Sequence, residues 1–150
     1  MVTIIVSSAP QIRFPDCYGI DMSKMGEFVA FQALIRLLNE RGLEEKLEIV
    51  YDKCKAQEHL PKEQIKNYVQ ELYDLFDYED VSAKIAEIVT LPEIVPEVAV
   101  IYQTLDGLHA ACPNNKGDWY FSGDYPTPGG NRVVNRAFIN YMENKNVRAY

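Results

Sequence analysis

The sequence has few cysteines, no cluster of basic residues and no long apolar run. Its three cysteines, at positions 17, 54 and 112, are odd in number and widely spaced, which argues against disulfides and favours reduced thiols. The 15 lysines and arginines are dispersed in a chain of net charge −7, so we expect no nucleic-acid partner. No run reaches the roughly 18 apolar residues of a membrane span, and the first residues lack the basic segment of a signal peptide. We therefore expect a soluble, cytoplasmic protein with no membrane partner.

Several motifs of enzyme and metal sites are also missing. No G-x-x-x-x-G-K, G-x-G-x-x-G or H-E-x-x-H occurs, which argues against a phosphate-binding loop, a dinucleotide fold and a zinc peptidase. The chain has fewer thiols than the usual cysteine set of an iron–sulfur cluster, so we expect none. His59 and His109 stand apart and are interpreted as packing or surface residues rather than ligands.

The stretch that organises the chain lies near its start. Residues 2–6 are a short, β-branched apolar run, which predicts a strand buried on both faces of a parallel sheet. Residues 7–21 follow with two prolines and one glycine, and they predict an ordered, extended loop. A loop at the carboxyl end of a parallel strand is where α/β sheets bind their ligands. Residues 98–102 are the only other strong strand candidate, and so small a sheet is marginal. We therefore expect the rest of the sheet upstream of residue 1.

Helical spacing of apolar residues accounts for most of the remaining chain. Gly42 is expected to end the first helix, Thr104 to cap a short one, and Thr127-Pro128 to open the last. The expected helices cover about residues 28–38, 43–54, 61–76, 81–89, 105–112 and 128–142. The predicted fold class is mostly α with a small β component.

Two stretches resemble one enzyme family. The first contains Ser8-Ala9-Pro10, Ile12-Arg13-Phe14-Pro15 and Tyr18-Gly19-Ile20-Asp21, and the second is Phe121-Ser122-Gly123-Asp124-Tyr125-Pro126-Thr127. They resemble the glutamine phosphoribosylpyrophosphate amidotransferases (amidophosphoribosyltransferases). In that family a strand runs through a Ser-Pro-rich turn into Ile-Arg-Phe-Pro and Tyr-Gly-Ile-Asp, and Phe-Thr-Gly-x-Tyr-Pro-Thr opens the last helix. Here Ser122 replaces the threonine. The resemblance covers residues 2–30 well and residues 78–142 more weakly.

The resemblance implies the carboxy-terminal portion of a type I phosphoribosyltransferase-like domain plus a helical subdomain. Residues 1–30 would end the phosphoribosyltransferase-like core, and residues 78–150 would form a carboxy-terminal helical region with short strands. Residues 31–77 have no counterpart in the family pattern and are interpreted as a helical insertion.

By the same resemblance, the parent enzyme catalyses the first committed step of de novo purine synthesis. It frees ammonia from glutamine and passes it to C1 of phosphoribosylpyrophosphate with the help of Mg²⁺, giving phosphoribosylamine, glutamate and pyrophosphate. The family's catalytic amino-terminal cysteine and its Asp-Asp loop are both absent here. We therefore expect this chain to be inactive alone and to hold no cofactor. Its expected partners are upstream glutaminase and phosphoribosyltransferase regions and further copies in a homo-oligomer.

Four residues are candidates for the site. The resemblance implies a substrate-site or interdomain role for Arg13, Tyr18 and Asp21, and an ammonia-channel wall at Phe28. From the residues alone, other roles stay open. Asp21 can instead cap a helix, Arg13 and Tyr18 can be packed or surface residues, and Phe28 can belong to the core.

A second hypothesis comes from a different class of protein. The chain would then be a stand-alone, non-catalytic helical interaction or regulatory module, with residues 31–77 as its binding element. What precedes residue 1 distinguishes the two hypotheses. A purine-nucleotide regulatory site is compatible with the enzyme, and no residue pattern locates it.

Overall fold

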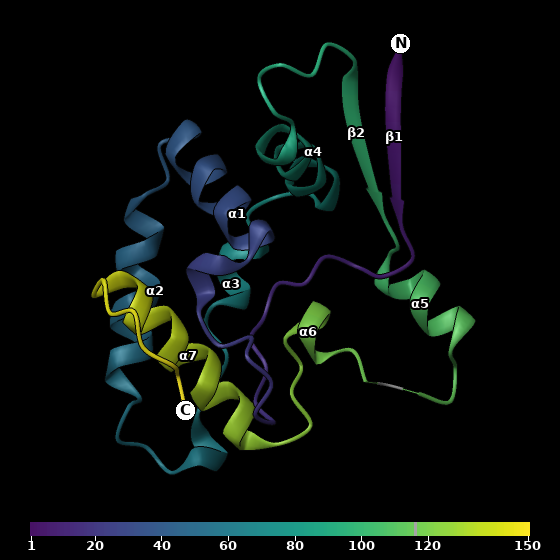
Figure 1. Cartoon of the computed structure of the whole chain (residues 1–150). Coiled ribbons are helices and arrows are strands. Elements are labelled where there is room, and N and C mark those ends of the chain that lie inside the picture. The colour runs from purple at the N-terminus through teal and green to yellow at the C-terminus, as the bar shows by residue number, and fades with distance from the viewer. Residues whose placement is uncertain (116) are drawn as a thin grey trace.

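Helices make up most of the protein, and two parallel strands lie side by side at one edge of them (Figure 1). The computed structural model describes residues 1–115 and 117–150. Its elements are β1 (Val2–Ser7), η1 (Met25–Glu27), α1 (Val29–Glu40), α2 (Glu45–Ala56), η2 (Lys62–Gln64), α3 (Gln70–Tyr73), α4 (Tyr78–Val89), β2 (Glu97–Tyr102), α5 (Leu105–Ala111), α6 (Trp119–Ser122) and α7 (Pro128–Met142). The expected fold class, mostly α with a small β component, is confirmed.

The sheet is a single parallel pair in which Val2 lies opposite Glu97 and Ser7 opposite Tyr102. The two expected strands are therefore confirmed, but the burial expected for residues 2–6 is wrong. Ile4 is 59% exposed and Val6 is 71% exposed. A parallel strand is buried only where further strands and helices cover it. Within the described residues, β1 pairs with β2 alone, and the helix that packs against the sheet is α4, next to β2 (Figure 1).

The core lies among the helices rather than on the sheet. Phe31 of α1 is fully buried, and its ring meets Phe138 of α7 edge-on at 6.3 Å between centroids and Tyr141 at 4.8 Å. Helix α1 packs on α4, and α2 packs on α7. Buried residues from 1–30, 31–77 and 78–150 belong to one hydrophobic cluster. The boundaries drawn between these three segments stay a prediction.

One predicted helix is wrong. Residues 61–76 form only η2 and α3, and the chain between them is not helical. In this segment, side chains form hydrogen bonds with backbone N–H and C=O groups that would pair with each other in a helix. The Gln57 amide bonds both the N–H and the C=O of Lys66, at 3.0 and 2.7 Å, and Asn135 donates to the same C=O at 2.8 Å. Asn131 donates to the C=O of Ile65 at 2.9 Å. Most apolar residues of this segment are still buried, but the backbone that carries them is not one continuous helix.

The expected helix ends are confirmed at two positions. Gly42 adopts φ +66°, and just past it the N–H of Leu43 donates to the C=O of Leu38 at 2.8 Å, which closes α1. Thr104 caps α5 by accepting the N–H of Gly107 at 3.0 Å. The first long helix begins at Val29 after the short turn η1.

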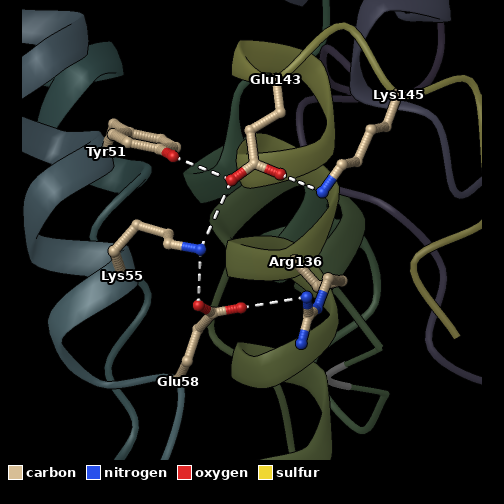
Figure 2. A network of polar contacts seen from close by, with 6 residues as sticks. All are labelled: Tyr51, Lys55, Glu58, Arg136, Glu143 and Lys145. Carbon is tan, nitrogen blue, oxygen red and sulfur yellow. Dashed lines mark hydrogen bonds and ion pairs between the residues drawn. The ribbon is translucent and has the colours of Figure 1, made fainter.

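A network of charged side chains ties α2 to α7 (Figure 2). The carboxylate of Glu143 accepts the Tyr51 hydroxyl at 2.8 Å and pairs with Lys55 at 3.4 Å and with Lys145. Lys55 continues to Glu58 at 2.8 Å, and Arg136 pairs with the other oxygen of Glu58 at 2.9 Å. Hydrogen bonds, first from Lys145 and then from Tyr51, lower the pKa of Glu143 to about 2. The network therefore keeps Glu143 ionised at acidic pH, below the ordinary pKa of a glutamate.

Candidate functional site

A cavity of about 470 Å³ opens at the carboxyl ends of β1 and β2. Ser7 and Tyr102, the last residues of the two strands, form part of its wall. The rest comes from the loop after β1, from the segment around Phe28 and from Ile85 of α4. This is the edge at which parallel sheets present ligand sites. A cavity thus lies at the edge where the sequence places the site, and its role as a site stays a prediction.

The walls of this carboxyl-edge cavity are mainly apolar. Pro10, Met22, Phe28, Val29 and Ile85 are among the apolar lining residues, while the carboxylates come from Asp21 and Glu27. The apolar walls disfavour charged species, because desolvation penalises an ion more than a neutral molecule, whereas the two carboxylates favour a cation beside them. The cavity therefore suits a small molecule that is neutral or positively charged.

Two of the four predicted site residues line the cavity. The side chain of Asp21 is exposed and pairs with Arg148 at 3.3 Å instead of capping a helix. Phe28 precedes α1 in an extended conformation and is half-buried. It also packs against the hydrophobic core, so it is both a cavity wall and a packing residue.

The other two predicted site residues lie outside the cavity lining. Arg13 donates to the Gln11 side chain at 3.0 and 2.7 Å, and its guanidinium lies 4.6 Å from the centre of the Tyr73 ring. Burial lowers the pKa of this guanidinium. Tyr18 is 58% exposed and meets the Trp119 ring edge-on at 5.6 Å. Arg13 therefore fastens the loop to the helices, while Tyr18 contacts α6.

Sequence reasoning missed the residue around which the loop folds. Asp16 is fully buried, and its Oδ2 accepts the backbone N–H groups of Tyr18 and Ile20, both at 2.8 Å. Its Oδ1 accepts the Tyr120 hydroxyl at 2.5 Å. Burial alone raises the pKa of Asp16, but these hydrogen bonds outweigh it and hold the pKa below its usual range. An aspartate two residues before Tyr18-Gly19 is a turn signal that could have identified it.

The two stretches that carry the family resemblance contact each other. The N–H groups of Arg13 and Phe14 donate to the C=O of Tyr120 at 2.9 and 3.1 Å, and the Tyr125 hydroxyl donates to the C=O of Pro15. Gly123 adopts φ +79° at the end of α6, where a Cβ would clash with the Phe14 ring. Figure 1 shows α6 beside the loop that follows β1. The cavity loop is therefore supported by the carboxy-terminal motif.

Within the described residues, neither a metal-binding group nor a membrane-spanning helix is found. Across residues 1–115 and 117–150, no group of three or more His, Cys, Asp or Glu side chains could hold a metal ion. His109 and Asp118 form a single ion pair at 2.7 Å. In the same part of the chain, no helix is long and apolar enough to cross a bilayer.

Comparison with protein families, curated proteins and solved structures found no match to this chain. Three features of the structure bear on function. They are the cavity, the loop that borders it, and the contact between the two motif stretches.

Proposed function

We propose that the chain is the carboxy-terminal part of an amidophosphoribosyltransferase. The parent enzyme would use glutamine and phosphoribosylpyrophosphate to make phosphoribosylamine in de novo purine synthesis. In this proposal the chain ends a type I phosphoribosyltransferase-like sheet and contributes a helical subdomain. Its partners are the upstream glutaminase and phosphoribosyltransferase regions and further copies of the enzyme, in the cytoplasm.

The observation that carries the proposal is the contact between the two motif stretches. Pro15 and Tyr125 are 110 residues apart in the sequence, and the Tyr125 hydroxyl donates to the C=O of Pro15. A common origin of the two stretches in one family accounts for this contact.

The exposed strands support the same proposal. Ile4 and Val6 are strongly apolar yet more than half exposed, as expected for a strand whose neighbouring strand and covering helices lie outside this chain. Burial of such a side chain contributes about 1.5–3 kcal/mol. A further parallel strand on β1 and helices on both faces would recover that free energy.

The apolar cavity has a defined role in this proposal. Ammonia released from glutamine reacts only as the neutral molecule, and an apolar wall disfavours the ammonium ion. Phe28, Met22 and Val29 would line part of the path, and Asp21 would stand at its mouth. The bond-breaking steps take place on residues outside this chain.

Mg²⁺ does not fit the residues present here. The described residues hold no cluster of carboxylates or histidines that suits the ion. The proposal therefore assigns it to the upstream region together with phosphoribosylpyrophosphate.

The first experiment measures the size of the native polypeptide with an antibody against this chain. A band several times larger than 17.2 kDa is expected, because the catalytic regions would lie upstream. A band at 17.2 kDa would contradict the enzyme and favour the interaction or regulatory module, for which a binding partner would then be sought.

The second experiment measures activity. The native protein is expected to form phosphoribosylamine from phosphoribosylpyrophosphate with either glutamine or ammonium as the nitrogen source. Residues 1–150 alone are expected to turn over neither substrate, and this chain serves as the matched negative control. Absence of both activities from the native protein would overturn the proposal.

A further inference from the structure

We propose that Asp16 is a positioning residue that sets the rim of the carboxyl-edge cavity and links that rim to α6. This inference rests on the proposed function, because it concerns the path by which ammonia would pass the cavity.

Asp16 holds the chain on both sides of Asp21. Its side chain binds the N–H of Ile20 at 2.8 Å, and its own N–H donates to the C=O of Met22 at 2.8 Å. Asp21 lies between these two bonded residues, and both Asp21 and Met22 line the cavity. The placement of this part of the wall is therefore determined by Asp16.

The side chain of Asp16 acts only as an acceptor. Both oxygens of Asp16 accept hydrogen bonds, Oδ2 from two N–H groups and Oδ1 from the Tyr120 hydroxyl. An alanine has no acceptor and leaves all three donors without a partner, whereas the NH₂ of an asparagine can donate to the Tyr120 oxygen. Because the site is buried, water does not replace the lost bonds. Asp16→Ala is therefore the variant that removes all three hydrogen bonds.

The link from the Asp16 side chain to α6 runs through the Tyr120 hydroxyl. Tyr120 donates its O–H to Asp16, while its C=O separately accepts the N–H groups of Arg13 and Phe14. Tyr120→Phe removes the first contact and leaves the backbone contacts in place. Burial first, and then the bond to Asp16, raise the pKa of Tyr120 to about 12. The hydroxyl therefore keeps its proton further into the alkaline range than a free tyrosine.

A displaced rim would let ammonia escape to solvent after it is made. Glutamine would still be hydrolysed, and ammonia added from outside would still reach phosphoribosylpyrophosphate. The expected defect is loss of coupling, measured as glutamate released per phosphoribosylamine formed. A purely structural role would lower all partial activities together.

The test compares four variants of the native enzyme. In Asp16→Ala the ratio of glutamate to phosphoribosylamine is expected to rise about tenfold, as for loss of a hydrogen bond to a charged group. Tyr120→Phe is expected to give a smaller rise, and ammonium-dependent synthesis is expected to stay within about twofold in both. Tyr51→Phe and Glu143→Gln are the matched controls. They remove a hydroxyl and a carboxylate from the α2–α7 network of Figure 2 and are expected to leave the ratio unchanged.

Hydrogen exchange of the same proteins supplies the structural measurement. In Asp16→Ala the amides of Tyr18 and Ile20 are expected to exchange about tenfold faster than in the wild type. An unchanged ratio in this variant, or a parallel fall of all activities, would overturn the positioning role. A wild-type enzyme without any turnover would overturn the proposed function and the positioning role with it. Faster exchange would then still show that Asp16 holds the loop.

Discussion

The helical body and the two-stranded sheet are built from similar apolar residues but differ in how they are covered. In the body, Phe31, Leu34 and Phe138 are fully buried. In the sheet, Ile4 is 59% exposed and Val6 is 71% exposed. The difference shows that the body completes its own core, whereas the sheet offers an apolar surface that its own chain leaves uncovered.

The cause of this difference is the number of neighbours that each element has. Helices α1, α2, α4 and α7 each pack against another helix, so their apolar stripes face one another. A strand has two faces and two edges, and among the residues that the structure describes β1 has only β2 at one edge. Burial contributes about 1.5–3 kcal/mol for each large apolar side chain. The body therefore carries the stability of this chain.

The largest expected effect is in the body. Phe31→Ala should lower the free energy of unfolding by about 3–5 kcal/mol, because it leaves a cavity between Phe138 and Tyr141. Urea unfolding followed by circular dichroism measures the change. A loss below about 1 kcal/mol would contradict a core centred on α1 and α7.

An effect of intermediate size on stability is expected when the pH is lowered. The pKa of Glu143 is lowered in the folded protein to about 2, so its contribution to stability is fully present above the ordinary glutamate pKa. That contribution is lost as the pH falls from the ordinary value toward 2. The urea midpoint of wild type should therefore fall more steeply over this range than that of Glu143→Gln.

The control for the acid experiment lies in the sheet. Glu97→Gln removes an exposed carboxylate from the first residue of β2, outside the α2–α7 network. Its acid profile should follow that of wild type. If Glu97→Gln and Glu143→Gln reduced the pH dependence of the urea midpoint equally, a specific role for the network would be contradicted.

The smallest effect is expected in the sheet. Ile4→Ala should change the unfolding free energy of this chain by no more than about 0.5 kcal/mol, because the side chain is mostly exposed. In the native protein, where the proposal places further strands and helices on β1, the same substitution should cost about 2–5 kcal/mol. Thermal unfolding of both forms makes the comparison. An equal loss of unfolding free energy in this chain and in the native protein would contradict the proposal that the native protein covers the sheet.

Local patterns in the sequence determined most of the elements. Apolar periodicity identified the main helices and both strands, because a 3.6-residue or β-branched pattern depends only on neighbouring positions. Gly42 and Thr104 were likewise predictable, since a left-handed turn and a cap each involve residues a few positions apart. The location of the cavity at the carboxyl edge of the strands followed from the rule for parallel sheets.

Contacts between distant residues decided the rest. Residues 65 and 66 leave the helical pattern because Gln57, Asn131 and Asn135 bind their backbone. Asp16 takes the central place in the loop because Tyr120, 104 residues away, completes its hydrogen bonds. The exposure of β1 depends on how many elements reach it. Such outcomes depend on which side chains meet in space, and spacing along the chain does not encode that.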